Sequence, residues 1–374
     1  MNASFLNEQK NFNLFLDLLK QLIRVPSVTG AEHSFLLYLK RELDELGVKT
    51  EHYDGLLVAI GKEPENGFLS AHIDRHGVIC TGPNEFQFAA FLAKNRSDLR
   101  GNSLSEQTFQ QISKRYINQG VHAYDPFSGS YLGTGKIKDA FLKEEINNLI
   151  FKIEGLSHLL PGTPIAFIDK LKQDGNLISA QLDNVISAAI ILFLYQNGYE
   201  GTAFFTAQEE AGKSWRYINE WFKKNKVSTD KLIVLDTSPY ESRQEADKQM
   251  VVLRNKDVNA RFKSPLLDEI KKFCKKNKIT FSCKDKFITE KNKKRVQEGL
   301  KPISIGSTEL GRIIMESNKK IQGTTLQIPT TGYHTVDETA NILSVKSIIF
   351  ILSSFYIKTK IFKQEGKNEF SYYL

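Results

Sequence analysis

The sequence of 374 residues predicts an α/β fold, in which a mixed sheet is sandwiched by helices and carries an inserted small β-barrel-like domain. Two observations predict this fold. From Leu177 onward, short strand-like apolar runs alternate with helical patterns, which is typical of a largely parallel or mixed sheet with helices on both faces. Between residues 77 and 175 the pattern changes to short runs separated by glycine and proline, which indicates a β-rich insertion.

The N-terminal part of the chain predicts two helices and then three strands. Residues 10–23 have an amphipathic helical pattern, and residues 31–47 predict a second helix that a glycine closes. Strands are expected at residues 48–53, 56–61 and 67–74. The third run consists of apolar and small residues, which predicts a buried strand.

The insertion divides the chain into three parts. We expect residues 1–76 and 176–374 to form a main domain, and residues 77–175 to form the inserted β-rich domain. Within the insertion, the polar stretch 92–120 is either helical or a long excursion. The apolar run 348–357 is too short to span a bilayer and is interrupted by serines, so a buried final helix is expected.

Histidines and carboxylates recur where the strand-like runs end. They are His72 and Asp74 in AHID, Asp183 in AQLDN, Glu209 and Glu210 in TAQEE, Asp236 in IVLD, and His334 in GYHT. Zinc takes nitrogen from neutral histidine and oxygen from carboxylate, and a catalytic pair of ions about 3.5–4 Å apart usually shares a bridging ligand. The set is therefore sufficient for two ions, with one carboxylate left over to act as a base.

Strand geometry suggests roles for some of these residues. Residues i and i+2 of a strand share a face, so Asp74 lies on the side of His72, where its carboxylate can accept the other ring N–H. Adjacent residues point to different sides, so one of Glu209 and Glu210 can bind metal while the other faces the water to be activated. The carboxyl ends of strands are also where open α/β sheets bind ligands.

Each of these signals has an ordinary explanation when it is taken alone. A His-x-Asp pair arises by chance, a Glu-Glu pair is usually a solvated helix face, and an Asp at the end of a strand is often a helix N-cap. A single histidine near a turn is usually a satisfied polar side chain. The order of the residues, each at the end of a strand-like run, is what favours a metal site.

The same order resembles a known family. His-x-Asp, Asp-Asn, Glu-Glu, Asp and a late His, together with VPSVTGAEHSF, IGSTELGRI and LQIPTTGYHTVDE, are similar to the di-zinc exopeptidases of the MH clan. Within that clan, the chain looks most like the tetrahedral, glutamyl and deblocking aminopeptidases. The resemblance runs from about residue 20 to residue 358. It implies a main domain that is zinc-exopeptidase-like and catalytic, and an insertion that helps to assemble oligomers.

The resemblance also implies roles for single residues. It implies that His72 and Asp236 bind one ion and that Glu210 and His334 bind the other. Asp183 would bridge the two ions. Glu209 is then the general base, and Asp74 is the catalytic partner of His72. No substrate-binding residue is assigned.

Some positions depart from the pattern of the relatives. Asn184 is followed by Val185, where a basic residue is usual. Residues 213–215 (KSW) stand where small, glycine-like residues are usual, and residues 307–309 (STE) stand where relatives carry Gly-Thr-Asp. No ligand is lost, so these residues, which are expected near the pocket wall, bear on substrate preference.

The residues and the resemblance together predict a metal-dependent aminopeptidase that acts on peptides. Two divalent ions per subunit, with zinc favoured over cobalt or manganese, would acidify a water whose proton Glu209 takes. An N-acyl-amino-acid deacylase or a carboxypeptidase would use the same ligands and base, and both stay alternatives. A non-catalytic binding protein is a further alternative, which the presence of both Glu residues and all expected ligands disfavours.

The basic charge is not expected to mark a nucleic-acid or membrane partner. The net charge is +8, with lysine-rich segments at residues 271–278 and 284–295. The lysines are interrupted by apolar residues in core-like positions, and no nucleic-acid-binding motif accompanies them. We therefore expect peptide substrates and a homo-oligomer, with no nucleic acid and no membrane.

The cysteines and the N-terminal segment suggest a cytoplasmic protein. Cys80, Cys274 and Cys283 have unrelated spacings, which predicts neither a disulfide framework nor a zinc-thiolate site. The N-terminal segment has no pattern of a secretory signal. The tail of residues 363–374 is polar and then aromatic, and is expected to be disordered or to dock on a partner subunit.

Overall fold

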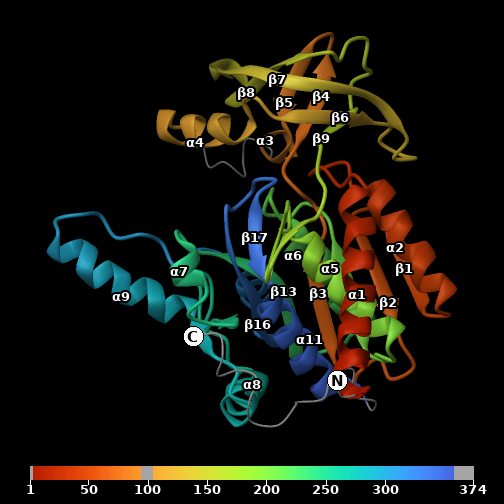
Figure 1. Cartoon of the computed structure of the whole chain (residues 1–374), viewed down its shortest axis with the longest axis vertical. Coiled ribbons are helices and arrows are strands. Elements are labelled where there is room, and N and C mark those ends of the chain that lie inside the picture. Colours follow the sequence, from red (N-terminus) through yellow and green to blue (C-terminus); the bar gives the residue numbers. More distant parts are fainter. Residues whose placement is uncertain (1–2, 94–103, 358–374) are drawn as a thin grey trace.

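A large mixed sheet, helices on both of its faces and a small closed barrel make up the molecule (Figure 1). The computed structural model describes residues 3–93 and 104–357. The predicted fold class is confirmed. Residues 94–103 of the polar stretch and the tail of residues 363–374 lie outside the described residues, so the expectations for them stay predictions.

Within the described residues, the large sheet has eleven strands, most of which follow one hydrogen-bonded path. Across the sheet, the path is β1 (Lys49–Tyr53), β2 (Leu56–Ile60), β12 (Thr202–Thr206), β3 (Phe68–His72), β13 (Thr229–Pro239), β16 (Ile321–Thr331), β17 (Glu338–Asn341), β11 (Leu177–Ala180) and β10 (Lys172–Asp174). Beside this path, β14 (Val251–Leu253) pairs with β16 and with β15 (Phe281–Cys283). The three strands predicted in the N-terminal part are β1, β2 and β3.

The centre of the sheet is parallel. Strands β12, β3, β13 and β16 run in the same direction. Strand β11 also shares this direction, because it is antiparallel to β17, which in turn is antiparallel to β16. The carboxyl ends of all five strands therefore meet at one edge of the sheet, where open α/β sheets bind ligands.

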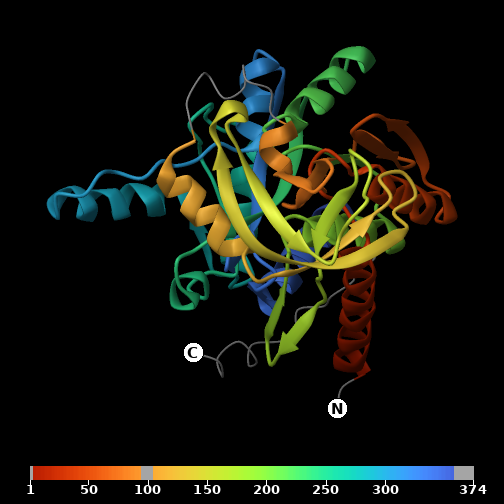
Figure 2. The same cartoon turned by 90° about the horizontal axis from the view of Figure 1, so that it is seen from above.

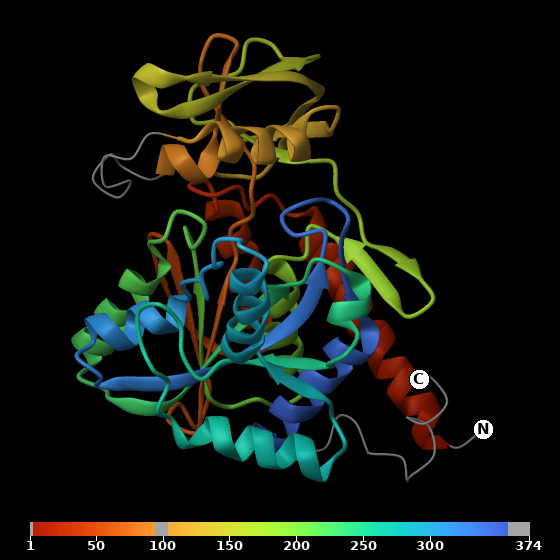
Figure 3. The same cartoon turned by 90° about the vertical axis from the view of Figure 1, so that its left-hand side faces the viewer.

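Helices cover both faces of the sheet (Figure 3). One face packs against α1 (Ala3–Arg24), α2 (His33–Glu45), α5 (Val185–Gln196), α8 (Pro265–Lys276) and α11 (Ile342–Tyr356). The other face packs against α6 (Ser214–Asn225) and α10 (Glu309–Glu316). The two faces follow the alternation of the strands, since Leu69 and Ala71 of β3 belong to the first core and Phe68 belongs to the second.

Helix α5 explains one departure from the pattern of the relatives. It is apolar on all sides, and its residues from Val185 to Tyr195 are buried. A helix of this kind belongs in the interior, and α5 lies between the sheet and the outer helices α1 and α2. A basic side chain at position 185 would have to be buried here, whereas Val185 fits the core.

The insertion is a closed barrel with a core of its own. Its strands are β4 (Val78–Gly82), β5 (Glu85–Phe88), β6 (Gly120–Tyr124), β7 (Tyr131–Lys143), β8 (Asn148–Glu154) and β9 (Pro164–Phe167), paired in the order β4-β5-β8-β7-β6-β9. It also carries α3 (Ala89–Ala93), α4 (Glu106–Tyr116) and η1 (Glu144–Ile146). Tyr116 of α4 packs on Phe151 and Phe167 inside a hydrophobic cluster separate from those of the sheet.

The pairing of strand β10 indicates where the insertion ends. Strand β10 lies within the range 77–175 but pairs with β11 in the large sheet. We therefore propose that the inserted domain begins between His72 and Val78 and ends between Phe167 and Lys172. The barrel sits above the edge of the sheet at which β3 ends (Figure 1).

Two further helices lie outside the layers described above. Helix α7 (Arg243–Ala246) lies near β16, and the basic helix α9 (Lys284–Gln297) extends away from the body of the molecule (Figures 1 and 2). Among residues 3–93 and 104–357, no helix is both long and apolar enough to cross a membrane. The predicted final helix is α11, and the three cysteines are free thiols.

The core between β12 and the first helical layer allows a stability test. Phe205 of β12 is fully buried, four residues before Glu209. We expect Phe205→Ala to lower the free energy of unfolding by about 3–5 kcal/mol, because the lost burial leaves a cavity. Thermal unfolding at a fixed scan rate measures the shift. The control is Leu300→Ala, whose side chain is 47% exposed, with an expected effect within about 0.5 kcal/mol. Equal shifts for the two variants would contradict the packing.

Candidate metal centre and active site

The predicted site residues meet at the carboxyl edge of the parallel strands. They lie at or after the strand ends: His72 and Asp74 at β3, Glu209 and Glu210 after β12, Asp236 on β13, Asp183 after β11, and His334 after β16. The direction of these strands, rather than closeness in the sequence, brings the side chains together.

One group of potential ligands consists of His72, Asp183 and Asp236. The Nε2 atom of His72 lies 3.3 Å from Oδ1 of Asp183 and 3.6 Å from Oδ1 of Asp236. The three ligand atoms all lie within 4.8 Å of one another. His72 and Asp183 are buried, and Asp236 is partly exposed. One imidazole and two carboxylates are donors that zinc accepts.

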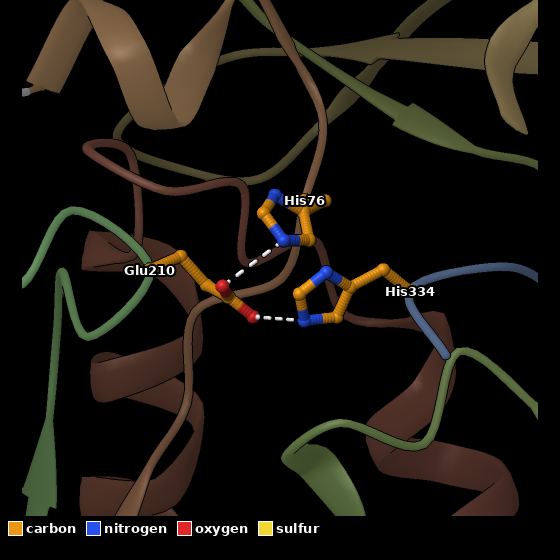
Figure 4. Close-up of side chains that lie close together, drawn as sticks. All are labelled: His76, Glu210 and His334. Atoms are coloured by element: carbon orange, nitrogen blue, oxygen red, sulfur yellow. Dashed lines mark ion pairs between the residues drawn. The ribbon is translucent and has the colours of Figure 1, made fainter. Parts of the chain in front are cut away.

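A second group consists of His76, Glu210 and His334 (Figure 4). The Oε2 atom of Glu210 lies 3.0 Å from Nε2 of His76, and its Oε1 atom lies 3.2 Å from Nε2 of His334. Asp183 connects this group to the first, because its Oδ2 atom lies 3.4 Å from Nε2 of His334. The two oxygens of Asp183 thus face different groups, as a bridging ligand requires.

The ligand atoms fit a cation better than they fit one another. Among the described residues, Nε2 of His76, Nε2 of His334 and Oδ1 of Asp183 are buried without a hydrogen-bond partner. They nevertheless lie within 3.0–3.4 Å of oppositely charged groups. Buried polar atoms are normally hydrogen-bonded. Atoms that converge without pointing at each other are expected where an ion takes the central position, so these residues fit divalent cations.

The electrostatics of the cluster also call for cations. Burial lowers the pKa of His72, but Asp183, Asp236 and Asp74 raise it more, so that it lies well above its ordinary value. Burial likewise lowers the pKa of His334, but Glu210 and Asp183 raise it, to about 10. The carboxylates therefore hold protons on both imidazoles. Metal ions displace protons from such ligands, because histidine binds metal in its neutral form.

Glu209 lies outside both groups and next to an open pocket. Burial raises the pKa of Glu209 well above its ordinary value, and His72 opposes this while Glu210, Asp236 and Asp74 add to it. A pocket of about 150 Å³ is lined by Glu209 and Glu210. A carboxylate with a raised pKa beside a pocket and a metal centre is suited to proton transfer.

Asp74 holds the segment that carries the two glutamates. Its Oδ1 atom accepts from the backbone N–H of Glu209 at 2.8 Å, and its Oδ2 atom accepts from that of Glu210 at 3.1 Å. The Nδ1 atom of His72 lies 3.5 Å from Oδ1 of Asp74. Asp74 thus contacts the backbone of the Glu pair by hydrogen bonds and lies beside the imidazole that it was predicted to orient.

Two further buried carboxylates hold the backbone around the site, and the sequence analysis singled out neither. Glu32 accepts from the N–H of Gln208 at 3.1 Å, where the backbone has φ of 60°. Glu338 accepts from the N–H of Asp183 at 2.9 Å. Burial and the charge of Asp183 raise the pKa of Glu338 to about 8. Both acids bind the backbone of loops that carry potential ligands. The positive φ of Gln208 is costly for a residue other than glycine, and the contact with Glu32 helps to hold it.

Most of the residues that depart from the pattern of the relatives line the pocket. Ser214, Trp215 and residues 307–309 belong to its wall, together with Arg312. The side chain of Glu309 is turned inward and accepts hydrogen bonds from Ser70 at 2.8 Å and Thr206 at 3.0 Å. Burial raises the pKa of Glu309. The positions of Ser214, Trp215 and residues 307–309 agree with the expectation that the departures lie near the pocket wall, whereas Val185 lies in the core and does not.

The barrel reaches the site through helix α4. The Nη1 atom of Arg115 lies 3.4 Å from Nδ1 of His334. The ring of Tyr333 stacks on the imidazole of His334, with centroids 3.5 Å apart and an interplanar angle of 29°. His334 itself has φ of 61°, in the left-handed region. The position of the late histidine thus depends on both domains.

His76 is the one member of the two groups that the sequence analysis did not single out. It stands two residues after Asp74 and four after His72, in the connection between β3 and β4. A second histidine in so short a segment is a signal that could have been noticed. The connection has no periodic pattern, however, so the sequence does not show which way this side chain points.

A model of one protein family matches more than half of the chain. The model of the M42 glutamyl aminopeptidases matches residues 156–350, which include every predicted ligand except His72. This match confirms the resemblance that the motifs indicate. A search of curated protein sequences found no match.

Solved structures of archaeal peptidases share the fold. The TET1 peptidase of Pyrococcus horikoshii, which assembles into a tetrahedron or a large octahedral shell, is 15% identical, with a TM-score of 0.65 over 92% of this chain and 100% of that one. The TET aminopeptidase from Thaumarchaeota archaeon SCGC AB-539-E09 is 15% identical, with a TM-score of 0.66 over 94% and 98%. An aminopeptidase of Desulfurococcus kamchatkensis is 13% identical, with a TM-score of 0.66 over 95% and 99%.

The position of Asp183 between the two groups leads to a prediction about metal content. We expect Asp183→Ala to lose both ions, because a shared carboxylate serves each ion and offsets their mutual repulsion. His72→Ala and His334→Ala each remove a ligand of one group, so each is expected to retain more metal. Metal-to-protein ratios of the purified variants decide this. Unchanged stoichiometry in Asp183→Ala would exclude the bridging role.

Proposed function

Because this chain belongs to the M42 glutamyl aminopeptidase family, whose members are metal-dependent peptidases, we propose that it removes N-terminal residues from peptides with two divalent ions and Glu209 as the general base. One observation carries the proposal. Two groups of ligand atoms share Asp183, while Glu209 lies outside both groups and beside the pocket.

The donor set suggests how the ions are held. His72 and Asp236 would bind one ion, Glu210 and His334 would bind the other, and Asp183 would bind both. When bound, such ions act as Lewis acids that acidify water and polarise a carbonyl oxygen. Imidazole and carboxylate donors suit zinc first, and they also accept cobalt or manganese.

Glu209 and Asp74 would handle the proton of the attacking water. Glu209 would accept a proton from the attacking water and pass it to the leaving amine. Burial and the neighbouring carboxylates raise the pKa of Glu209, which makes its carboxylate a better proton acceptor. Asp74 fixes the backbone of Glu209, so the carboxylate is held in place before the substrate binds.

Replacement of the base gives a direct test. We expect Glu209→Gln to lower kcat by about 10²–10⁴-fold, since the amide cannot take the proton. Both ions should remain, because Glu209 belongs to neither ligand group. Steady-state kinetics and metal analysis on the same preparation measure the two effects. If Glu209→Gln loses metal while Glu210→Gln keeps both ions, the two roles are reversed.

A substrate panel separates the proposed reaction from its alternatives. Aminoacyl-anilides test aminopeptidase activity, N-acetyl amino acids test deacylase activity, and N-blocked dipeptides with a free carboxylate test carboxypeptidase activity. We expect turnover of the anilides alone, by the zinc-, cobalt- or manganese-loaded protein. Turnover of only the N-acetyl or N-blocked substrates would replace the proposed reaction, although the metal centre would stand.

We also propose that the chain forms a homo-oligomer through the barrel. Several large apolar side chains of the barrel are exposed, among them Phe127 at 71%, Tyr131 at 58% and Leu160 at 77%. Exposed apolar side chains that gather on one module favour an interface. The Pyrococcus horikoshii relative, which has the same fold, is a large assembly.

Light scattering after size exclusion tests the oligomer. For the full chain we expect the mass of a dimer or a larger assembly, that is, two or more times 42.5 kDa. A variant with Phe127→Ser, Tyr131→Ser and Leu160→Ser should dissociate toward the monomer, because the interface loses apolar area. A monodisperse monomer for the unmodified chain would contradict the oligomer, and the aminopeptidase proposal would remain.

A further inference from the structure

We propose that His76 is an additional protein ligand of the ion held by Glu210 and His334, so that the two metal sites differ in their number of nitrogen donors. This inference deepens the proposed function and depends on its metal centre. It assigns a role to a histidine that the proposed reaction does not otherwise use.

The geometry places the imidazole of His76 where a ligand is needed. Its Nε2 atom and that of His334 approach opposite oxygens of Glu210, at 3.0 and 3.2 Å (Figure 4). The three ligand atoms all lie within 4.8 Å of one another. The two histidines come from separate connections, one before β4 and the other after β16, and their ring centroids are 3.9 Å apart.

The protein itself offers His76 no other partner. The side chain is buried, and among the described residues neither ring nitrogen has a hydrogen-bond partner. Nε2 lies 3.0 Å from Oε2 of Glu210, which is an ion-pair contact, and Nδ1 has no partner of this kind. A buried imidazole without a hydrogen bond carries the desolvation cost of its polar atoms. A cation between His76, Glu210 and His334 would satisfy all three side chains.

The surroundings of His76 fix the ring in this position. Its imidazole stacks on Phe88 of the barrel, with centroids 5.4 Å apart and an interplanar angle of 17°. Its backbone carbonyl accepts from Nε2 of Gln181 at 2.9 Å, two residues before Asp183. The ring is therefore held from the barrel, and its backbone is held from the segment that carries the bridging carboxylate. Ligands held in advance in this way bind metal more tightly.

The consequence is a pair of unequal sites. The site of His76 has two imidazoles, Glu210 and the shared Asp183, whereas the other has one imidazole, Asp236 and the shared Asp183. Nitrogen donors favour zinc and cobalt over manganese and magnesium. The ion beside His76 should therefore be the more strongly retained one, and the more selective for zinc.

A simpler role for His76 would be to orient Glu210 without touching the ion. Zinc affinity alone does not separate the two roles, because loss of a residue that orients a ligand also weakens binding, by about 10–100-fold. A test must therefore report on the atom that coordinates the metal.

Cobalt spectroscopy of His76→Cys provides this report. A thiolate bound to Co²⁺ produces a charge-transfer band in the near ultraviolet, and a thiol elsewhere does not. We expect the band in cobalt-loaded His76→Cys and its absence in the wild-type chain and in His122→Cys. His122 is a matched control, because it is a partly buried histidine of the barrel that contacts Tyr124 and belongs to neither ligand group. Absence of the band in folded His76→Cys would overturn the proposal.

Zinc titration and X-ray absorption complete the test if His76→Cys does not fold. In the wild-type chain, three imidazoles should surround the pair of ions, and in His76→Gln two should remain. His76→Gln and His76→Ala should bind one of the two ions at least about tenfold more weakly, and His122→Ala should bind both as the wild type does. An unchanged imidazole count in His76→Gln would overturn the role of His76. A wild-type chain that binds no zinc would instead refute the proposed metal centre.

Discussion

Excess negative charge in a buried space is the constraint that dominates this structure. The carboxyl edge of the parallel strands brings together five carboxylates and three histidines: Asp74, Asp183, Glu209, Glu210 and Asp236, with His72, His76 and His334. Buried carboxylates of this density need positive charge, which either protons or metal ions can supply. The raised pKa values of His72 and His334 show how strongly the cluster attracts it. A chain without bound cations would therefore pack this edge less favourably.

A second set of acids stabilises the loops that carry the first. Asp74, Glu32 and Glu338 accept hydrogen bonds from the backbone N–H groups of the Glu pair, of Gln208 and of Asp183. Backbone amides that point at a buried carboxylate fix the loop without adding another side chain to the pocket. The left-handed backbone of Gln208 is retained because this contact compensates its strain. Residues that hold ligands in this way are part of the metal centre even though they do not touch a metal.

The sequence could predict the strands and the histidines and carboxylates at their ends, because both leave local signals. Apolar runs such as that of β12 have a period, and an acid that follows them stands out. The contacts of Glu32 and Glu338 join segments far apart in the sequence, so no local pattern shows them. His76 was missed for a related reason, since its connection has no period and its direction depends on contacts with Phe88 and Gln181, which lie elsewhere in the sequence. The membership of β10 in the large sheet depends on a pairing partner, β11, that the strand pattern alone does not identify.

The barrel contributes contacts to the candidate metal centre. It has its own hydrophobic core, yet Phe88 stacks on His76 and Arg115 lies beside His334. Both contacts come from elements on the side of the barrel that faces the sheet, and both reach the group that contains Glu210. A shift of the barrel relative to the sheet would change the environment of the group of His76, Glu210 and His334 more than that of the group of His72, Asp183 and Asp236. Because the same domain carries exposed apolar side chains, any assembly through it would also restrain the geometry of this site.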